Sequence, residues 1–196
     1  MKKICSLIVV LAVLLPFFAL ATETETEKEE LGFWFETQAV GSNKPWKAIG
    51  WYEPPTKGQF GFFMLAEYES DGYRSTYAGP TWKPISWFRV GAGVGAEQAP
   101  EEKIRSIRGA MFFEIDREKF NVFAIFENGG TGPWHKVTAT YKPNEKFGIG
   151  GMKETDLGVG PRIEYNIRKN VQLWVAILHD IDTKTNTPMF AINFSF

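Results

Sequence analysis

Hydrophobic and polar residues alternate with a period of two along most of the chain from Leu31 onward. Between Phe88 and Glu97, for example, apolar residues at even positions alternate with glycine or charged residues at odd positions. Successive side chains of a β-strand point to opposite faces, so this pattern predicts strands. No segment has the i, i+3, i+4, i+7 spacing of an amphipathic helix, and the mature chain is therefore expected to be all-β.

Clusters of Gly, Pro, Asn and Asp interrupt the alternation at regular intervals and mark turns. They divide the chain into twelve predicted strands, over residues 32–41, 46–53, 59–69, 73–79, 86–97, 104–115, 119–128, 133–142, 146–153, 156–166, 170–180 and 186–196. Every connection is short, so neighbouring strands are expected to be antiparallel. Ten strands would remain if 73–79 and 146–153 do not span. An open sheet of this size would close into a barrel or split into a sandwich.

The first 21 residues have the features of a secretory signal peptide. Lys2 and Lys3 precede an uncharged apolar run, and Ala19-Leu20-Ala21 has the small-x-small form of a cleavage site. An anchored N-terminal helix is the alternative. Cys5 lies within this segment, so cleavage leaves a chain without cysteine. The expected domains are a signal peptide (1–21), an acidic periplasmic lead-in (22–30) and a β-barrel domain (31–196).

Two features favour a membrane barrel over a soluble sandwich. The polar face of several strands is rich in glycine, as at Gly91, Gly93 and Gly95, where strands bend or bulky neighbours fill a lumen. Aromatic residues gather near the predicted strand ends, where barrels carry interfacial girdles. These residues are Trp34, Trp46, Trp51, Tyr52, Tyr68, Tyr73, Tyr77, Trp82, Trp87, Trp134, Tyr141 and Tyr165.

The last eleven residues carry a third feature. Phe190, Ile192, Phe194 and Phe196 occupy every second position, and the chain stops on an aromatic residue. This strand resembles the C-terminal signal of bacterial outer-membrane β-barrel proteins, which the barrel-assembly machinery reads. The resemblance implies a closed antiparallel up-and-down transmembrane barrel with both termini in the periplasm and with outer-membrane lipid around it. The short loops on both sides depart from large porins, and no subfamily is identified.

Charged residues of both signs fall on the face opposite to the apolar one. If Phe, Val and Leu face outward, then Glu36, Lys47, Glu67 and Glu127 face inward, together with the candidate lumen-lining residues named next. The candidate lumen-lining residues are Glu69, Arg74, Arg89, Glu97, Arg108, Glu114, Lys136, Arg162 and Glu164.

Pairs of these charges are expected across hairpins, because an unpaired charge in a narrow lumen is costly. Glu69 should lie opposite Arg74, and Arg89 near Glu114. The charges either brace a filled barrel or line an aqueous path. In the second case Arg108 and Arg162 form the basic part of a selectivity zone.

Catalytic and cofactor chemistry finds little support in the sequence. His135 and His179 are expected on the outward face near the outer rim, and Ser70, Ser75 and Ser86 carry no local catalytic signature. Two histidines at this spacing form no zinc motif, and the Gly91–Gly95 segment lacks the GxGxxG form. We therefore predict no catalytic residue, cofactor or metal. The formal net charge of −1 excludes electrostatic nucleic-acid binding.

The sequence thus predicts an outer-membrane β-barrel that acts as a small passive, porin-like channel or as a filled structural barrel. Its partners would be lipid, the assembly machinery and small solutes if the lumen is open. Two alternatives remain: a secreted soluble β-barrel or sandwich that binds an apolar ligand, and an outer-membrane barrel enzyme acting at the outer rim.

Overall fold

The computed structural model of the chain describes residues 32–41, 44–100 and 105–196. Each secondary-structure element in these ranges is a strand. The strands are β1 (Phe33–Val40), β2 (Lys47–Tyr52), β3 (Phe60–Glu69), β4 (Arg74–Ile85), β5 (Phe88–Gln98), β6 (Arg105–Arg117), β7 (Phe120–Gly129), β8 (Gly132–Tyr141), β9 (Phe147–Glu154), β10 (Gly158–Arg168), β11 (Val171–Asp180) and β12 (Thr185–Ser195). The signal peptide and the acidic lead-in predicted for residues 1–30 lie outside the described residues.

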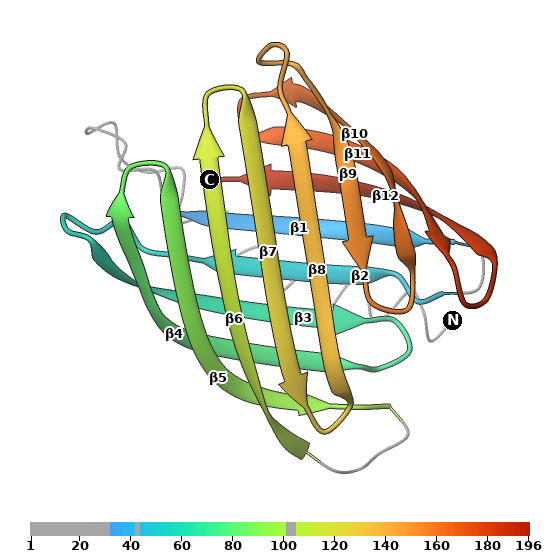
Figure 1. The fold of residues 1–196 in the computed structure, drawn as a ribbon. Helices are drawn as coiled ribbons and strands as arrows, with labels where there is room; N and C mark the ends of the chain where they lie inside the picture. Colours follow the sequence, from blue (N-terminus) through green and yellow to red (C-terminus); the bar gives the residue numbers. More distant parts are fainter. Residues whose placement is uncertain (1–31, 42–43, 101–104) are drawn as a thin grey trace.

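The strands follow one another around a closed antiparallel barrel (Figure 1). Each strand pairs with the next one in the sequence, and β1 pairs with β12 in the register Trp34↔Ser195 to Val40↔Met189. The predicted all-β, closed up-and-down barrel of twelve strands is confirmed, and the ten-strand version is wrong because β4 and β9 are full members. The termini of the barrel meet at one end, here called the terminal end. The turn after β1 lies at the other, the distal end.

The largest difference from the predicted boundaries is in β4. The sequence places a turn at Pro80 to Pro84, whereas the strand continues to Ile85. Proline has no N–H to donate, and the ladder between β4 and β5 skips from Ala78↔Val94 to Thr81↔Gly91 around Pro80. On the other side Pro80 still lies opposite Phe62 of β3, so the strand passes through the proline without a turn.

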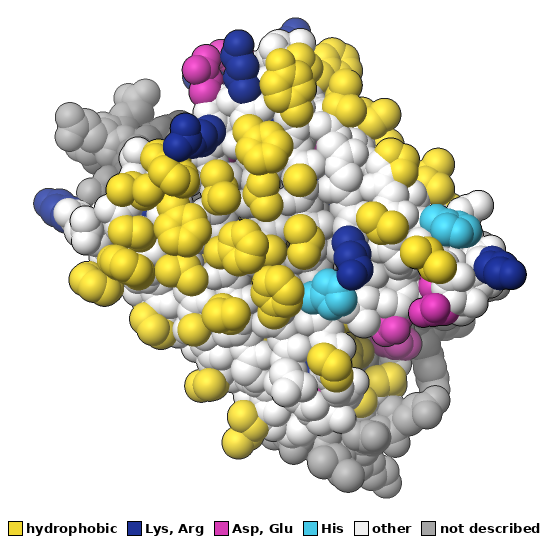
Figure 2. Space-filling view, viewed as in Figure 1, with side chains coloured by type: hydrophobic (Ala, Val, Ile, Leu, Met, Phe, Trp, Pro, Cys, Tyr) yellow, Lys and Arg dark blue, Asp and Glu magenta, His cyan; other side chains and the backbone are white. Residues whose placement is uncertain are grey.

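The outer face of the barrel is apolar around its circumference. Large hydrophobic side chains stand out from the strands with much of their surface uncovered, for example Phe60 (73%), Val94 (71%) and Ile107 (81%). Figure 2 shows hydrophobic side chains spread over the visible face, with few charges among them. Carboxylates of the described strands occupy the inward positions of the alternation, as Glu36, Glu97 and Glu164 do.

The inside of the barrel holds two hydrophobic clusters. The first packs Trp51 of β2 on Phe63 of β3 and Phe112 of β6, with ring centroids 5.0 and 4.8 Å apart. The second surrounds Trp174 and Leu178 of β11 and includes side chains from β1, β9 and β12. Because β2 and β6 are separated by three strands, the first cluster reaches across the lumen and fills part of it.

These clusters correct one expectation about the aromatic residues. Tyr52, Trp82 and Tyr141 are exposed outward near the terminal end, as a girdle requires. Trp51 and Tyr77, in contrast, are 2% exposed inside the barrel. Trp34 and Trp134 pack against the same inner cluster. An aromatic residue near a turn can point to either face, and the parity of its strand decides which.

No helix in the described part of the chain is long and apolar enough to cross a membrane.

Candidate functional site: the charged lumen

Eight of the nine candidate lumen-lining residues point into the barrel. Seven of them border its cavities: Glu69, Arg89, Arg108, Glu114, Lys136, Arg162 and Glu164. Glu97 is inward but 2% exposed, behind Arg108.

Arg74 is the exception, because it lies on the outer face and donates to Gln98. The hairpin pairs Arg74 with Tyr68, and the Glu69 N–H bonds to the Tyr73 carbonyl. The turn is thus displaced by one residue from the predicted one, which reverses the face. The other predicted pair is present: Arg89 lies opposite Glu114 at 2.6 Å.

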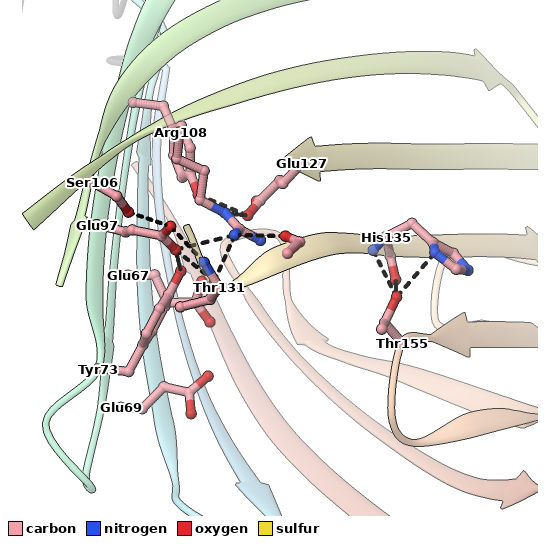
Figure 3. A network of polar contacts seen from close by, with 12 residues as sticks. Glu67, Glu69, Tyr73, Glu97, Ser106, Arg108, Glu127, Thr131, His135 and Thr155 are labelled. Carbon is pink, nitrogen blue, oxygen red and sulfur yellow. Dashed lines mark hydrogen bonds and ion pairs between the residues drawn. The ribbon is translucent and has the colours of Figure 1, made fainter. Parts of the chain in front are cut away.

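Arg108 of β6 is the centre of a buried ion network at the distal end (Figure 3). Its guanidinium lies 3.0 Å from Glu97 of β5 and 3.0 Å from Glu127 of β7. It also donates to the Thr131 hydroxyl at 2.7 Å and to the Gly132 carbonyl at 3.0 Å. With four acceptors and 3% exposure, Arg108 joins three strands and the β7–β8 turn, and acts as a brace of the barrel wall.

Glu97 receives further donors from the wall and from the turns. The Thr131 N–H and hydroxyl donate to it at 3.0 and 2.7 Å, and the Ser106 hydroxyl at 2.7 Å. Tyr73, in the turn before β4, donates at 3.2 Å. Burial raises the pKa of Tyr73 to about 12, so its hydroxyl keeps its proton and remains a donor. The carboxylate is thereby fully solvated by protein groups.

A second network crosses the lumen itself. Lys47 Nζ of β2 lies 3.5 Å from Glu67 and 3.0 Å from Glu69, both on neighbouring β3. It also donates to Glu154 of β9 at 3.2 Å. Four strands separate β2 from β9 by the shorter way round the barrel, so the Lys47–Glu154 pair joins opposite walls. Trp134 of β8 lies beside it, with its ring centroid 5.6 Å from the ammonium.

Lys136 of β8 makes the corresponding crossing on the terminal side of this pair. Its ammonium lies 3.7 Å from Glu154 and 3.9 Å from Glu36 of β1. Glu36 in turn accepts the Trp174 indole N–H at 2.7 Å. Arg162 stacks on the same indole, 4.1 Å from its centroid, and pairs with Glu164 at 2.8 Å. Charges of both signs therefore line this side of the lumen in alternation.

Two cavities remain between these networks. The distal cavity, of about 370 Å³, is bordered by turn residues such as Asp71, Pro100 and Asp156. The second, of about 280 Å³, extends toward the terminal end, where Asn121, Lys142 and Gln172 border it. The residues common to both linings form what we call the waist: Lys47, Glu67, Glu127, Trp134 and Glu154.

The second cavity is lined mainly by charged and polar side chains, and several of these residues also carry a buried polar atom without a hydrogen-bond partner among the described residues. Within the described part of the chain, six buried side-chain atoms lack a partner, and five of them belong to residues that border this cavity. They are Gln38 Oε1, Trp51 Nε1, Arg89 Nε, Glu154 Oε2 and Asn193 Oδ1. Buried polar groups are normally hydrogen-bonded, and a polar cavity of this size has room for several waters. The lining, with charged side chains such as Glu36, Arg89 and Glu164, therefore gives the cavity the chemistry of a hydrated space.

Sequence reasoning missed two groups of residues in the lumen. Glu154 is central to the waist, but the predicted strand stops at residue 153, one residue short of it. Extending the alternation of Gly148, Gly150 and Met152 by one step would have placed Glu154 inside. Trp134 and Trp174 also point into the lumen. Alternate residues of β8 and β11 face inward, and this parity was the signal that could have placed both side chains there.

The two histidines lie on the outward face, near the distal end. The His135 ring Nδ1 and the Thr155 hydroxyl are 2.9 Å apart, and His179 Nδ1 lies 2.9 Å from Asn186 Oδ1. Figure 3 shows His135 and Thr155 apart from the Arg108 network. Across residues 32–41, 44–100 and 105–196, no group of three or more His, Cys, Asp and Glu side chains is arranged to hold a metal ion.

The C-terminal residues complete the barrel wall. Phe190 is 47% exposed on the outer face, and Ile192 and Phe194 follow it at the same parity in β12. The Phe196 N–H donates to the Phe33 carbonyl, so the end of the chain is bonded to the start of β1. Whether the assembly machinery recognises this strand stays a prediction.

Comparisons with known proteins connect this arrangement to a known fold. No protein-family model matches the chain, and no curated protein matches it. Among solved structures, the KdgM porin is similar, with 13% identity, a TM-score of 0.56 and coverage of 83% of this chain and 99% of that chain. The KdgM porin in complex with disordered oligogalacturonate (12%, 0.54) and the NanC porin (8%, 0.53) each cover 84% of this chain and 98% of their own. At such identities the likeness shows the fold: this chain has the closed antiparallel barrel of these porins.

Proposed function

We propose that the chain is an outer-membrane β-barrel that forms a narrow, water-filled passage for small hydrophilic solutes. The membrane part of this proposal is supported by the outer face. Soluble monomers rarely expose apolar patches larger than a few hundred Å². Here large hydrophobic side chains stand exposed on strands all around the barrel, from Phe60 on β3 to Phe190 on β12. Lipid tails can cover such an apolar surface without loss of free energy. Closure of the barrel gives each described strand two paired neighbours, so that no strand edge meets the lipid.

The observation that carries the channel part is the hydrated second cavity. Sixteen of the 23 side chains that border this cavity are charged or polar, and such groups cost free energy in a dry core unless each is paired. Water in the cavity solvates this polar lining and removes the cost. The distal cavity adjoins it at the waist, so the two spaces together extend from the distal turns to the terminal end.

The likeness to porins agrees with this proposal at the level of the fold. An outer-membrane location, export through a cleaved signal peptide, assembly through the C-terminal strand and passive transport rather than catalysis all form part of the proposal. The aromatic cluster around Trp51 leaves only part of the lumen open, which limits the passage to small solutes.

The test is the single-channel conductance of the purified barrel in planar bilayers. Thr138 points inward at 9% exposure and borders the second cavity, while Val137 beside it has the outward parity. We expect Thr138→Trp to lower the conductance several-fold and Val137→Trp to leave it unchanged, provided that both fold by gel mobility. Absence of conductance in the wild type, or equal effects of the two variants, would overturn the channel.

A further inference from the structure

The ammonium group of Lys47 occupies the waist as a bound cation would. Three carboxylates surround it, those of Glu67, Glu69 and Glu154, at 3.5, 3.0 and 3.2 Å. The face of Trp134 completes the enclosure at 5.6 Å, which is cation–π distance. The Lys47 side chain is 12% exposed and that of Glu154 1%. The walls of the waist therefore bind positive charge, and at present that charge is tethered to β2.

The position of Lys47 makes it an obstacle to passage. It spans the lumen to β9, and the five waist residues are the ones on which both cavities border. A solute that moves from the distal cavity to the second one must pass these side chains. Lysine has a flexible four-carbon stem, so the ammonium can leave its position without a movement of the strand.

The charge around the waist favours cations. The distal cavity is bordered by six carboxylate side chains and three basic ones. One of the three bases, Arg108, is already committed to Glu97 and Glu127. In addition, Glu154 Oε2 accepts no hydrogen bond from the described residues, and Lys136 lies 3.7 Å away from it. A cleft with an excess of one charge focuses the field and concentrates counter-ions, so cations are enriched there and anions are repelled.

We propose that Lys47 is a tethered cation that narrows the waist, and that the passage selects small cations over anions. When the ammonium leaves, its three carboxylates are exposed to the lumen, and a cation from solution replaces it. An anion has no equivalent position, because no basic group other than Lys47 belongs to the five-residue waist. This inference rests on the proposed function, and the experiments below separate the two.

The first experiment measures conductance and reversal potential in a KCl gradient across a planar bilayer. Lys47→Gln should raise the conductance several-fold and shift the reversal potential further toward that of K⁺. Lys142→Gln is the matched control, because it removes the same charge from the second cavity near the terminal end, where Lys142 pairs with the exposed Asp116. It should change neither quantity appreciably. Lys47→Arg, which keeps the charge, should resemble the wild type. Lys47→Met serves as a second neutral variant if Lys47→Gln does not fold.

The second experiment needs no current. Cleavage of residues 1–21 removes Cys5, so Lys47→Cys and Lys142→Cys each place one reporter thiol in the lumen, and the wild type gives the background. The folded barrels are treated with a cationic and an anionic methanethiosulfonate reagent. At Lys47→Cys the cationic reagent should react at least about tenfold faster, since focused fields change association rates by at least this factor. At Lys142→Cys the two rates should be similar.

The outcomes separate the inference from the proposed function. If no variant conducts and Lys47→Cys reacts with neither reagent, the lumen is sealed and the channel itself fails. If the barrel conducts but Lys47→Gln behaves like Lys142→Gln, the channel stands and Lys47 is not its obstacle. Equal rates of the two reagents at Lys47→Cys would overturn the cation preference.

Discussion

Replacement of Arg108 by methionine tests the brace at the distal end. Methionine keeps the apolar stem but removes the guanidinium that bonds Glu97, Glu127, Thr131 and the Gly132 carbonyl. The carboxylates of Glu97 and Glu127 would then remain with 1% and 4% side-chain exposure and no counter-charge within the described part of the chain. Removing one partner of a buried ion pair costs about 3–5 kcal/mol. The hydroxyl and amide donors around Glu97 reduce this cost, so we expect a loss of about 3 kcal/mol, near the lower limit of that range.

The loss is measured by urea unfolding of the barrel in lipid vesicles, followed by tryptophan fluorescence. Arg74→Met is the matched control, because Arg74 lies exposed on the outer face and, among the described side chains, bonds only Gln98. Its loss should cost at most about 1 kcal/mol. Adding Glu97→Gln and Glu127→Gln to Arg108→Met should restore part of the stability by removing the unpaired charges. An Arg108→Met barrel within about 1 kcal/mol of the wild type would refute the brace, because a broken buried pair costs more than that.

Two further predictions concern the two faces of the wall. Met111 is 53% exposed on the outer face near the middle of β6. Met111→Arg should reduce the free energy of unfolding in vesicles by about 2–4 kcal/mol, which is the cost of an arginine in the middle of the bilayer. An unchanged urea midpoint would argue against lipid at this face. Gly91 points inward, where an added Cβ would lie 2.2 Å from the Phe112 ring, so Gly91→Ala should cost about 1–3 kcal/mol by overpacking. Gly109→Ala on the next strand meets nothing nearer than 4.0 Å and should be neutral in the same titration, and equal effects would contradict this packing.

The period-two pattern was sufficient for the barrel because it reports local geometry. Each turn cluster ends one strand, and short turns leave only antiparallel neighbours, so the order of the strands follows from the sequence. The strand number alone leaves a closed barrel or a sandwich, and the glycine-rich faces, the aromatic residues and the C-terminal strand favour the barrel. The turn at Asp71-Gly72 shows the limit of this reasoning. A displacement of one residue puts Arg74 opposite Tyr68 and turns it outward, because neighbouring residues of a strand face opposite sides.

Contacts across the lumen could not be predicted in the same way. Lys47 and Glu154 are separated by 107 residues and belong to non-adjacent strands. Their meeting depends on the tilt and stagger of the whole barrel, which no local pattern contains. The inner aromatic cluster could not be predicted for the same reason, because it also joins strands that are not adjacent. Trp51 and Tyr52 are neighbours near a turn, yet one is buried inside and the other is exposed outside.

The glycines of β5 were interpreted more successfully. The sequence predicts either a bend of the strand or bulky neighbours at these glycines. The Phe112 ring covers Gly91 and Phe63 covers Gly93, whereas at Gly95 an added Cβ would meet the backbone of Thr76. The sequence did not show which residues are these neighbours, because Phe112 comes from β6, next to β5, and Phe63 from β3, two strands away on the other side.

The central claim is that this chain forms a closed barrel in the outer membrane, and its gel mobility tests this most directly. Outer-membrane fractions that contain the protein are run with and without boiling in detergent. We predict that the protein stays with the membrane and that the unboiled sample migrates differently from the boiled one, because a closed barrel resists the detergent until it is heated. A protein found in the soluble fraction, with one mobility before and after boiling, would contradict the account.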